Sequence, residues 1–589
     1  MPWIRTPRSV LVLAVLFHSV PIHASGTIPM SMPVADLAVN PVTDTVFVRH
    51  TGAGFADDVT IVDGVAHTTQ VVTFPGNVAE LAVDPIRNRV YAKLASQPTV
   101  VALDVEDLSM QPIPVSGSDL YVDPGADRFY LRDGNTIRAV DGETGAVESY
   151  TPPPTLQAVL GVDPIAQALV VAYTFTDSSS YDYTVFEKVG GSPLHAIVTS
   201  PAAYGLNLMS GGTIDPFAER AFFTTPYGGV GRYEWASASI VGGGNGGELG
   251  TFEQLLIDPA RGVVWSEFND PMGSIGSVVG MNGSDLGYAG VGLLVFQHSF
   301  YAWAIQPATR RLYAAEQSLD SFATWLRQTS LDSAGALPTL ASGDSGYYEI
   351  ALNPLTNEIY TLGPSVYPFT TPPDLLELDE PVAAPVPMPT AITPGAPAGG
   401  SMTVGFSATS AWVPNAHGIR RIYYQVDSID GRWLPASPGG ATASATITGL
   451  APGAHTLYAF ATDGQEATLG KGQTILTGPV ASAAITVPAP PACSNGVDDD
   501  GDGLLDHPAD PGCKTAESMT ENPKCDDDLD NDGDGGIDWD GGASAGSPDP
   551  HCVATPWRDA ERAPVCGVGA ELVLVLAALV RMRRRIRIG

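Results

Sequence analysis

Two acidic segments near the C-terminal end of this 589-residue chain carry the residue types best suited to chemistry. The segment CSNGVDDDGDGLLD begins at Cys493 and CDDDLDNDGDGGID begins at Cys525, and the two align without a gap. Counted from the Asp five residues after each cysteine, Asp recurs at positions 1, 3, 5 and 9, with glycine at position 6. Alternate carboxylates around a glycine turn can converge on one Ca²⁺, which takes about six to eight oxygen ligands. The sequence therefore predicts one calcium site in each copy.

The predicted calcium ligands are the Asp residues at these positions and one Asp that stands three residues before the next cysteine. They are Asp498, Asp500, Asp502, Asp506 and Asp510 in the first copy, and Asp530, Asp532, Asp534, Asp538 and Asp549 in the second. Position 12 holds Ala509 and Gly541 where an EF-hand has a bidentate Glu, so EF-hand affinity is not implied. The spacing resembles EF-hand-like and thrombospondin type 3 calcium repeats, and we expect a structural calcium role. The alternative is a solvated acidic spacer.

All five cysteines fall in the last sixth of the chain. Each acidic copy is followed by a second cysteine, which suggests the pairs Cys493 with Cys513 and Cys525 with Cys552 among the three ways of pairing four. Secretion would favour their oxidation.

The N-terminal 26 residues have the order of a secretory signal. Arg5 and Arg8 precede the apolar run Val10 to Phe17, and small residues follow, with cleavage expected after Ala24 or Gly26. The apolar run is shorter than the roughly 20 residues of a membrane span. We therefore predict a signal peptide over residues 1–26 and a secreted protein.

Residues 566–589 predict a sorting or anchor tail. Cys566-Gly567 precedes an apolar stretch that ends at Val580, and five arginines follow. As a helix this stretch would cover only about 20 Å of a hydrocarbon core of about 30 Å. The tail resembles the MYXO-CTERM family of sorting tails of Gram-negative bacteria. The resemblance implies that Cys566 is processed or lipidated, that the tail meets the membrane only before processing, and that the protein reaches the cell surface. A weak ordinary anchor is the alternative.

An internal repeat governs most of the remaining chain. LAVNPVTDTVFV begins at Leu37, LAVDPIRNRVYA at Leu81, and IALNPLTNEIYT at Ile350 is the last of eight copies. Proline presets the backbone of a turn and the preceding Asp or Asn can bond the backbone beyond it, so each copy predicts two antiparallel strands joined by a turn. The eight repeat prolines are Pro41, Pro85, Pro124, Pro164, Pro216, Pro259, Pro307 and Pro354.

The period of 39 to 52 residues between these prolines leaves room for four strands per repeat, the size of one β-propeller blade. The pattern resembles the YVTN family of β-propeller repeats. We predict an all-β chain with an eight-bladed propeller over residues 27–380, with seven blades as the alternative, and Thr27 to Met32 as a strand that closes the last blade. The insertions between Phe175 and Gly212 and between Phe268 and Trp303 are the loops expected to bind a partner.

Residues 381–398 are proline-rich and predict an extended linker. The short alternating strands that follow predict a β-sandwich over residues 399–488, and ITGLAPGAHTLYAFATDG from Ile447 resembles immunoglobulin-like or fibronectin type III domains. We expect this sandwich to act as a stalk. The acidic calcium-binding region then occupies residues 489–565.

The formal net charge of −35 repels a phosphate backbone and argues against nucleic acid as a partner. We find no motif that predicts a catalytic residue, and His50, His67, His195 and His298 are scattered over the propeller. The sequence predicts a non-enzymatic binding or scaffold protein on the outer envelope of a Gram-negative bacterium, with an unidentified surface protein or glycan as partner. The alternatives are a lyase-like or dehydrogenase-like propeller enzyme that acts at the channel mouth, favoured by convergent His or carboxylate groups there, and a purely structural envelope protein.

Overall fold

The structure, a computed structural model, describes residues 26–562 apart from short internal segments. The positions left out are 53, 154, 205–207, 209–210, 226–228, 245–253, 270–274, 287, 297, 319–323, 333–338, 344–348, 363–374, 380–382, 398–399 and 544. The predicted signal peptide up to residue 25 and the predicted tail with Cys566 lie outside the described residues. The chain divides into two compact units. One comprises the chain to Gly395, Thr403–Thr446 and His455–Ile485, and the other comprises Ala396–Met402, Ile447–Ala454 and the chain from Thr486.

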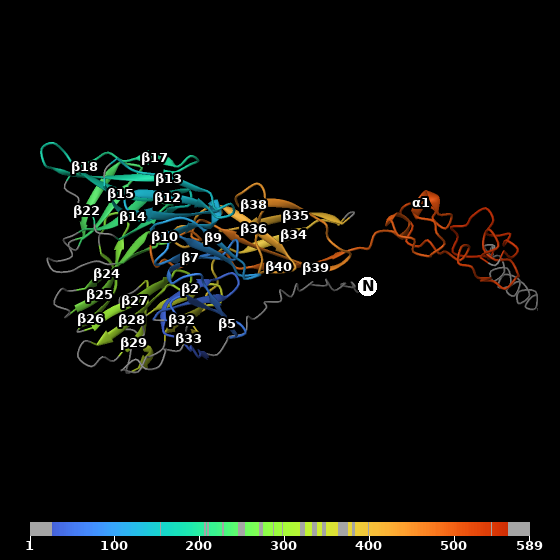
Figure 1. Ribbon diagram of the computed structural model, residues 1–589, viewed down its shortest axis with the longest axis horizontal. Coiled ribbons are helices and arrows are strands. Elements are labelled where there is room, and N and C mark those ends of the chain that lie inside the picture. The colour runs from blue at the N-terminus through green and yellow to red at the C-terminus, as the bar shows by residue number, and fades with distance from the viewer. Residues whose placement is uncertain are drawn as a thin grey trace, which may run out of the picture. The chain divides into compact units, whose positions relative to one another are not determined.

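Eight antiparallel sheets in the described residues each begin at one repeat copy and form the blades of a propeller (Figure 1). The first four blades consist of β2 (Val34–Asn40), β3 (Thr45–His50), β4 (Asp58–Asp63) and β5 (Thr69–Thr73); β6 (Val78–Asp84), β7 (Arg89–Leu94), β8 (Val100–Asp104) and β9 (Met110–Ile113); β10 (Ser118–Asp123), β11 (Arg128–Asp133), β12 (Thr136–Asp141) and β13 (Val147–Tyr150); and β14 (Thr155–Asp163), β15 (Ala168–Thr176), β16 (Asp182–Gly190) and β17 (His195–Thr199), with β18 (Ala203–Tyr204) as a fifth strand on β16.

The next four blades follow the same order. They consist of β19 (Gly212–Asp215), β20 (Arg220–Thr225), β21 (Gly229–Glu234) and β22 (Ser239–Gly244); β23 (Leu255–Asp258), β24 (Val263–Asn269), β25 (Ile275–Asn282) and β26 (Tyr288–Phe296); β27 (His298–Gln306), β28 (Arg311–Ser318), β29 (Thr324–Ser330) and β30 (Thr339–Gly343); and β31 (Ile350–Asn353), β32 (Glu358–Leu362) and β33 (Leu375–Asp379), completed by β1 (Gly26–Ile28).

The blades close into a ring. The first strand of each blade contacts the first strand of the next, and β31 of the last blade contacts β2 of the first. The N-terminal strand β1 pairs antiparallel with β33, with Gly26 opposite Glu377 and Ile28 opposite Leu375. The structure thus confirms the all-β propeller and has eight blades. The closing strand is shorter than the predicted Thr27 to Met32.

The repeat motif forms the turn between the first and second strands of each blade, as predicted. In the second copy the side chain of Asp84 accepts the backbone N–H groups of Ile86 at 2.9 Å and Arg87 at 3.1 Å. Asp163 holds Ile165 and Ala166 in the same way. The residue that ends each turn has a left-handed backbone, for example Asn88 with φ of 50°. A 3₁₀ turn, η1 (Pro124–Ala126), replaces this turn in the third copy.

The sandwich has two sheets. One contains β34 (Thr390–Pro394), β35 (Ser401–Ala408) and β38 (Thr442–Thr448); the other contains β37 (Leu434–Pro435), β36 (Arg421–Val426), β39 (Gly453–Thr462) and β40 (Ala481–Val487). Along β35 the side chains alternate between buried and exposed, which is the pattern of a strand with one face on a core. The prediction of paired β-sheets after the propeller is confirmed.

The C-terminal unit has little regular structure after the sandwich. It contains η2 (Ala492–Ser494) and a single short helix, α1 (Asp506–Ala509), among its described residues. Two disulfides join Cys493 to Cys513 and Cys525 to Cys552, in the predicted pairing. No helix within residues 26–562 that the structure describes is long and apolar enough to cross a membrane.

Candidate functional site

The sandwich packs against the turn end of the propeller. The residue after the repeat proline of the first two copies, Val42 and Ile86, lies in one buried cluster with Trp433 and Phe460 of the sandwich. The backbone N–H of Trp433 also donates to the carbonyl oxygen of Ile86 at 2.8 Å. The sandwich is therefore packed directly on the propeller.

The proline-rich segment and the sixth blade share a second such cluster. Val386 and Met388, from the predicted linker, are buried with Ala260 of the sixth blade and Trp412 of the sandwich. On the fifth blade the ring of Phe217 stacks on His417 with centroids 3.7 Å apart. Burial lowers the pKa of His417 to about 4, so this ring is neutral near pH 7.

The loop between β39 and β40 enters the channel enclosed by the first strands of the blades. Thr468 donates its N–H to the carbonyl oxygen of Val122 at 3.0 Å and accepts the N–H of Val162 at 2.8 Å. The carbonyl oxygen of Leu469 accepts the N–H of Ile214 at 3.0 Å. First strands of a propeller leave one edge unpaired towards the channel, and this loop, Gly464–Ile475, satisfies part of that edge.

The loop continues across two more blades. The side-chain amide of Gln473 accepts the N–H of Ile257 at 3.0 Å and donates to its carbonyl oxygen at 2.9 Å. Thr474 donates its hydroxyl to the carbonyl oxygen of Ile305 at 3.0 Å. The side chain of Leu469 is buried with Leu160 and Ile214 in the core beneath. In all, the loop bonds to backbone groups on the first strands of five consecutive blades, from the third to the seventh.

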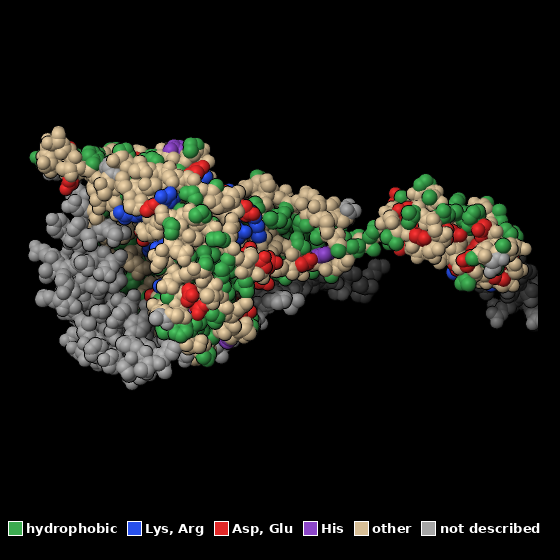
Figure 2. Space-filling view, viewed as in Figure 1, with side chains coloured by type: hydrophobic (Ala, Val, Ile, Leu, Met, Phe, Trp, Pro, Cys, Tyr) green, Lys and Arg blue, Asp and Glu red, His purple; other side chains and the backbone are tan. Residues whose placement is uncertain are grey.

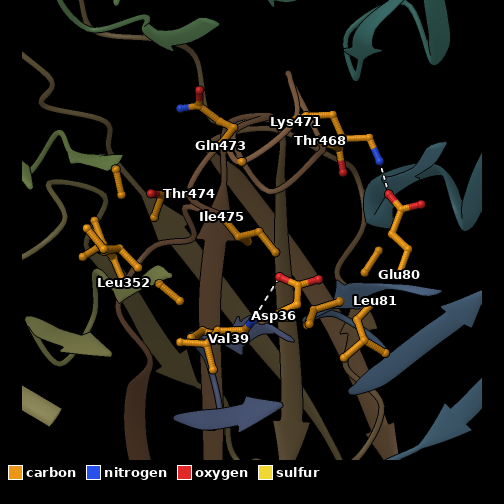
Figure 3. A pocket seen from close by; sticks show the side chains of 18 of the residues that line it. Asp36, Val39, Glu80, Leu81, Leu352, Thr468, Lys471, Gln473, Thr474 and Ile475 are labelled. Atoms are coloured by element: carbon orange, nitrogen blue, oxygen red, sulfur yellow. Dashed lines mark hydrogen bonds and ion pairs between the residues drawn. The ribbon is translucent and has the colours of Figure 1, made fainter. Parts of the chain in front are cut away.

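A cavity of about 320 Å³ remains beside this loop, on the side of the eighth, first and second blades (Figure 3). Its apolar wall includes Val39, Leu81 and Leu352, and the loop contributes Thr474 and Ile475. A second group of lining residues is charged: Asp36 from β2, Glu80 from β6, and Lys471 from the loop. An apolar wall with a few convergent polar groups is the usual composition of a ligand pocket.

Carboxylates converge where the first strands begin, at the end opposite the repeat turns. Asp36 and Glu80 hold the same place in the first and second copies, and Glu349 holds it in the eighth. Lys471 forms an ion pair with Glu80, and the Nε atom of Arg49 lies 3.6 Å from Oδ2 of Asp36. Burial, together with the charge of Asp36, raises the pKa of Glu349 to about 8. Burial also raises the pKa of Asp36, although Arg49 opposes the shift.

The histidines with described side chains do not join this group. His50 is buried, and its ring nitrogens lie 3.2 Å from the carbonyl oxygen of Pro33 and 2.7 Å from the hydroxyl of Thr60. His67 pairs with Glu377 at 2.7 Å, and His195 is exposed. The side chain of His298 is outside the described set. The carboxylates at the channel mouth therefore meet one condition for the enzyme alternative, without a histidine among them.

The suspected insertion after Phe175 forms the long hairpin of β15 and β16. Phe175 is 37% exposed and stacks on Tyr183 with centroids 5.4 Å apart. Much of the second insertion, between Phe268 and Trp303, has no described side chains.

Acidic side chains gather on the C-terminal unit (Figure 2). Carboxylate oxygens of Asp498, Asp500 and Asp502 lie within 4.8 Å of one another. In the second copy, ligand atoms of Asp532, Asp534, Asp549 and His551 are equally close. The structure therefore brings together positions 1, 3 and 5 of the first copy, and positions 3 and 5 of the second with Asp549.

The predicted ligand at position 9 of each copy accepts hydrogen bonds from the loop backbone. Asp506, at position 9, accepts the N–H of Gly496 at 3.0 Å, and Asp538 at the same position accepts the N–H of Asp527 at 3.0 Å. The position 1 residue Asp530 accepts two glycine N–H groups, yet it also lies within 4.8 Å of Asp532 and Glu561. The position 9 side chains shape the loop, and no group of convergent ligand atoms in the described residues contains them.

Sequence reasoning missed two buried glutamates that hold the loops. Glu521 accepts the N–H groups of Asp499 at 2.8 Å and Asp506 at 3.2 Å. Glu561 accepts those of Asn531 and Asp538 at the equivalent places of the second copy. Each stands eight or nine residues after the second cysteine of its copy, and that shared spacing is the signal that could have revealed them.

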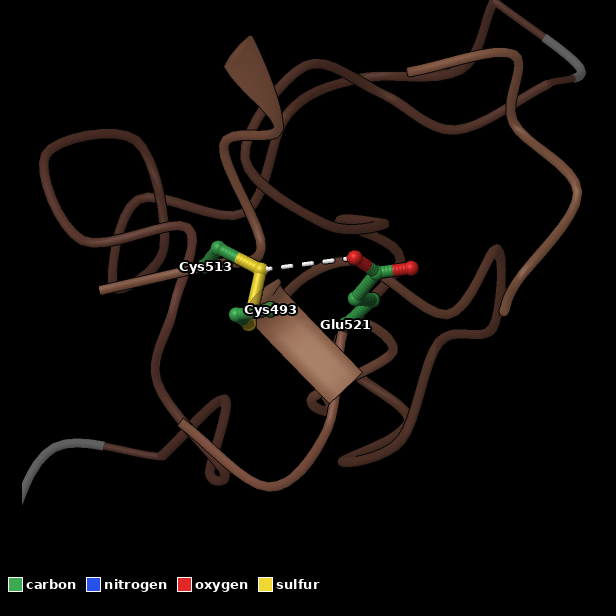
Figure 4. A group of neighbouring side chains, drawn as sticks. All are labelled: Cys493, Cys513 and Glu521. Carbon is green, nitrogen blue, oxygen red and sulfur yellow. Dashed lines mark hydrogen bonds between the residues drawn. A yellow bond between two sulfur atoms is a disulfide. The ribbon is translucent and has the colours of Figure 1, made fainter. Parts of the chain in front are cut away.

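Glu521 also lies beside the first disulfide, with Oε1 3.8 Å from Sγ of Cys513 (Figure 4). Because both sulfurs of Cys493 and Cys513 are consumed in the disulfide, neither is a thiolate that could bind a metal. The group of Cys493, Cys513 and Glu521 is therefore a structural contact.

Asp526 is a further missed residue. Its Oδ1 accepts the indole N–H of Trp539 at 2.8 Å, and its Oδ2 is buried without a hydrogen-bond partner. Burial raises its pKa to about 7, and the charges of Asp510, Asp500 and Asp502 add to the shift. Asp526 thus belongs to the second copy in sequence and to the electrostatic environment of the first.

The fit to calcium rests on the chemistry of these donors. The side chain of Asp549 is fully buried, and its Oδ2 has no hydrogen-bond partner. Burial and neighbouring Asp charges raise the pKa of Asp500 to about 6. Buried, mutually repelling carboxylates are stabilised by a cation, and the oxygen-rich set suits a hard ion such as calcium.

The ring of eight antiparallel sheets, seven of four strands and one of five, defines this chain as a β-propeller protein. No protein-family model and no curated protein sequence matches it. Solved structures with which it aligns include the mitotic checkpoint complex (9% identity, 64% of this chain and 97% of that chain, TM-score 0.36). They also include dihydro-heme d1 dehydrogenase NirN in complex with DHE (13%, 58% and 73%, TM-score 0.41). A third is the β-propeller domain of the trilobed protease from Pyrococcus furiosus (10%, 53% and 98%, TM-score 0.36). These likenesses carry no argument about function.

Proposed function

We propose that this protein is a secreted, cell-surface-attached binding or scaffold protein that receives its ligand at the open end of the propeller channel. The observation that carries the proposal is the seating of the sandwich loop. It bonds to backbone groups on the first strands of five blades and leaves a cavity of about 320 Å³ beside it. A loop held in this way is a fixed wall of the cavity.

The charge of the cavity supports binding over catalysis. Lys471 pairs with Glu80 and Arg49 approaches Asp36, so both carboxylates of the lining have a cationic neighbour. Carboxylates with a cationic neighbour stay ionised and can accept hydrogen bonds from the hydroxyl groups of a glycan or the N–H groups of a peptide segment. We therefore keep a surface protein or a glycan as the expected partner.

The proposal includes calcium in the C-terminal unit. The convergence of Asp532, Asp534 and the buried Asp549 supports it, and the two disulfides suit an oxidising compartment outside the cytoplasm. We also propose that the signal peptide is removed and that the tail is processed at Cys566 on a Gram-negative cell surface. Cleavage after Ala24 would retain Gly26, the first residue of β1.

Binding at the cavity is tested with the full secreted chain. The immobilised protein is exposed to envelope and extracellular material, and the recovered component is purified and titrated against wild type and variants. Asp36→Asn and Glu80→Gln each remove one charge of the cavity, and we expect a loss of affinity of about tenfold or more, the worth of one charge-assisted hydrogen bond. Glu106→Gln, an exposed acid outside the cavity lining, is the matched control. Saturable binding that all three variants leave unchanged would place the ligand elsewhere.

The enzyme alternative has one observation in its favour, the raised pKa of Glu349 beside Asp36. A carboxyl group that keeps its proton near pH 7 can serve as a general acid. An activity screen for lyase and dehydrogenase reactions on wild type and Glu349→Gln distinguishes the two. Turnover that Glu349→Gln abolishes would replace the binding proposal.

A further inference from the structure

The seam where the propeller closes, between the eighth and first blades, holds two buried carboxyl groups. Asp44 is 5% exposed and Glu358 is 3% exposed. The hydroxyl of Tyr360 lies 3.1 Å from Oδ1 of Asp44 and 2.8 Å from Oε2 of Glu358. A hydroxyl has one hydrogen and can donate to only one of these acceptors at a time. Asn353 donates its side-chain amide to Oδ1 of Asp44 at 2.6 Å.

The second oxygen of Asp44 has no hydrogen-bond partner although it is buried. Gly64 closes the space beside it, because a Cβ on Gly64 would lie 2.6 Å from this oxygen. Burial, and after it the charge of Glu358, raises the pKa of Asp44 to about 6. Two neighbouring buried carboxylates repel each other, and either a cation or a shared proton relieves the repulsion.

In the seam between the second and third blades, an arginine side chain supplies a positive charge. Asp127, Tyr91 and Gly142 stand there in the places of Asp44, Tyr360 and Gly64, and a Cβ on Gly142 would again touch both the carboxylate and the tyrosine hydroxyl. Arg87 fills the seam, with Nε 2.7 Å from Oδ1 of Asp127 and Nη1 3.1 Å from Oδ2 of Asp84.

The closing seam lacks this arginine. The repeat alignment puts Thr356 in the place of Arg87 and Glu358 in the place of Arg89. Thr356 donates its hydroxyl to Oε2 of Glu358 at 2.7 Å and brings no charge. The nearby buried Glu377 adds a third acid and is paired with His67 at 2.7 Å. The exchange of two arginines for a threonine and a glutamate leaves the seam acidic.

We propose that the closing seam binds a hard cation, of the calcium type, between the carboxylates of Asp44 and Glu358. In the second seam the guanidinium of Arg87 neutralises Asp127, the counterpart of Asp44. The donors are oxygens only, from these carboxylates and from the hydroxyls of Tyr360 and Thr356, which excludes metals that prefer nitrogen or sulfur. The ion joins the last blade, which the N-terminal strand completes, to the first. This site lies in the propeller and is separate in sequence from the acidic repeats.

The test measures the number of calcium ions bound per chain of the full secreted protein. The protein is equilibrated with calcium and desalted, and its calcium content is determined by inductively coupled plasma mass spectrometry. Glu358→Gln keeps the shape of the side chain and removes one charge, and we expect one ion fewer than in wild type. Thr356→Arg restores the guanidinium of the second seam. We expect it also to lose one ion and, in chelator, to melt at a higher temperature than wild type.

Glu106→Gln is the control and retains the wild-type ion count. The acidic repeats are intact in every variant, so their ions cancel in the comparison. Equal calcium content in wild type, Glu358→Gln and Thr356→Arg would overturn the proposal, and the two carboxyl groups would then share a proton. Circular dichroism of each variant establishes that the fold is kept, and Glu358→Gln remains informative if Thr356→Arg does not fold.

Discussion

Alanine at Gly161 is predicted to unseat the sandwich loop from the channel. Gly161 lies on β14, and a Cβ there would be 2.0 Å from the carbonyl oxygen of Leu469 and 2.5 Å from its carbon. Both are backbone atoms, so no side-chain rotation relieves the overlap. No positive φ constrains Gly161, so alanine itself is compatible with its backbone. The loop must therefore move by more than an ångström.

The expected cost follows from the hydrogen bonds on either side of that contact. The N–H of Val162 donates to Thr468 at 2.8 Å, and the N–H of Ile214 donates to Leu469 at 3.0 Å. Two buried N–H groups left without partners cost about 1–3 kcal/mol each. We expect a loss of about 2–6 kcal/mol in the local free energy of opening.

Hydrogen exchange followed by mass spectrometry measures this loss directly. Peptides that contain Val162 and Ile214 should exchange at least about tenfold faster in Gly161→Ala, since 1.4 kcal/mol corresponds to a factor of ten. Gly418→Ala is the matched control, because nothing lies within 4 Å of a Cβ at Gly418 and its φ is ordinary. If both peptides exchange equally in the two variants, the loop is not seated on β14 and the account of the channel is wrong.

Three further predictions concern the C-terminal unit and the docking face. Chelation of calcium should lower the unfolding temperature of the C-terminal unit, read from the hydrogen exchange of its peptides on heating. Identical exchange in calcium and chelator would rule out structural calcium there. In chelator, the raised pKa of Asp526, about 7, means that stability is fully present below the unfolded pKa near 4 and is lost as pH rises through 7. Asp526→Asn should flatten this fall in a pH series of melting temperatures, and an equally steep fall in the variant would refute the assignment. Trp433→Ala removes a side chain that is 1% exposed and lies between the propeller and the sandwich. It should lower the free energy of unfolding of the first unit in denaturant by about 3–5 kcal/mol. A loss below about 1 kcal/mol would mean that the propeller and the sandwich do not pack against each other as described.

The blades were predictable because their information is local. Proline after Asp or Asn fixes a turn within four residues, and the β-branched and aromatic residues on either side form the strands that it joins. The same locality let two cysteines per acidic copy indicate their own pairing. Blade number followed from counting the turns, and the N-terminal strand of the last blade followed from the need to complete its sheet.

The contacts of the sandwich were not predictable in the same way. Thr468 bonds to Val122 across 346 residues of sequence, and neither residue carries a pattern that names the other. The proline-rich composition of residues 381–398 predicts an extended spacer. In the structure, however, the side chains of Val386 and Met388 are buried. Composition describes how a segment behaves alone and cannot show the surface on which it packs.

The sequence correctly predicted that the C-terminal loops are acidic. It could not show which carboxylates hold the backbone and which are free to bind a metal ion. Asp506 and Asp500 look alike in the repeat and both accept a backbone N–H, yet only Asp500 lies in a group of convergent ligand atoms. The roles of Glu521 and Asp526 depend on how later segments fold back onto each loop.

The sequence by itself determined the repeated turns, the all-β architecture, the disulfide pairs and the acidic character of the C-terminal region, since each arises from residues that are neighbours in the chain. Only the tertiary structure decided that the sandwich loop enters the channel and that Asp44 meets Glu358. The loop contacts of Thr474 and Thr468 join residues 169 and 346 positions apart. Ring closure brings Asp44 next to the eighth blade, where it meets Tyr360 from 316 positions away. The burial and the charge of these side chains depend on the closed ring, so neighbouring residues in the sequence do not determine them.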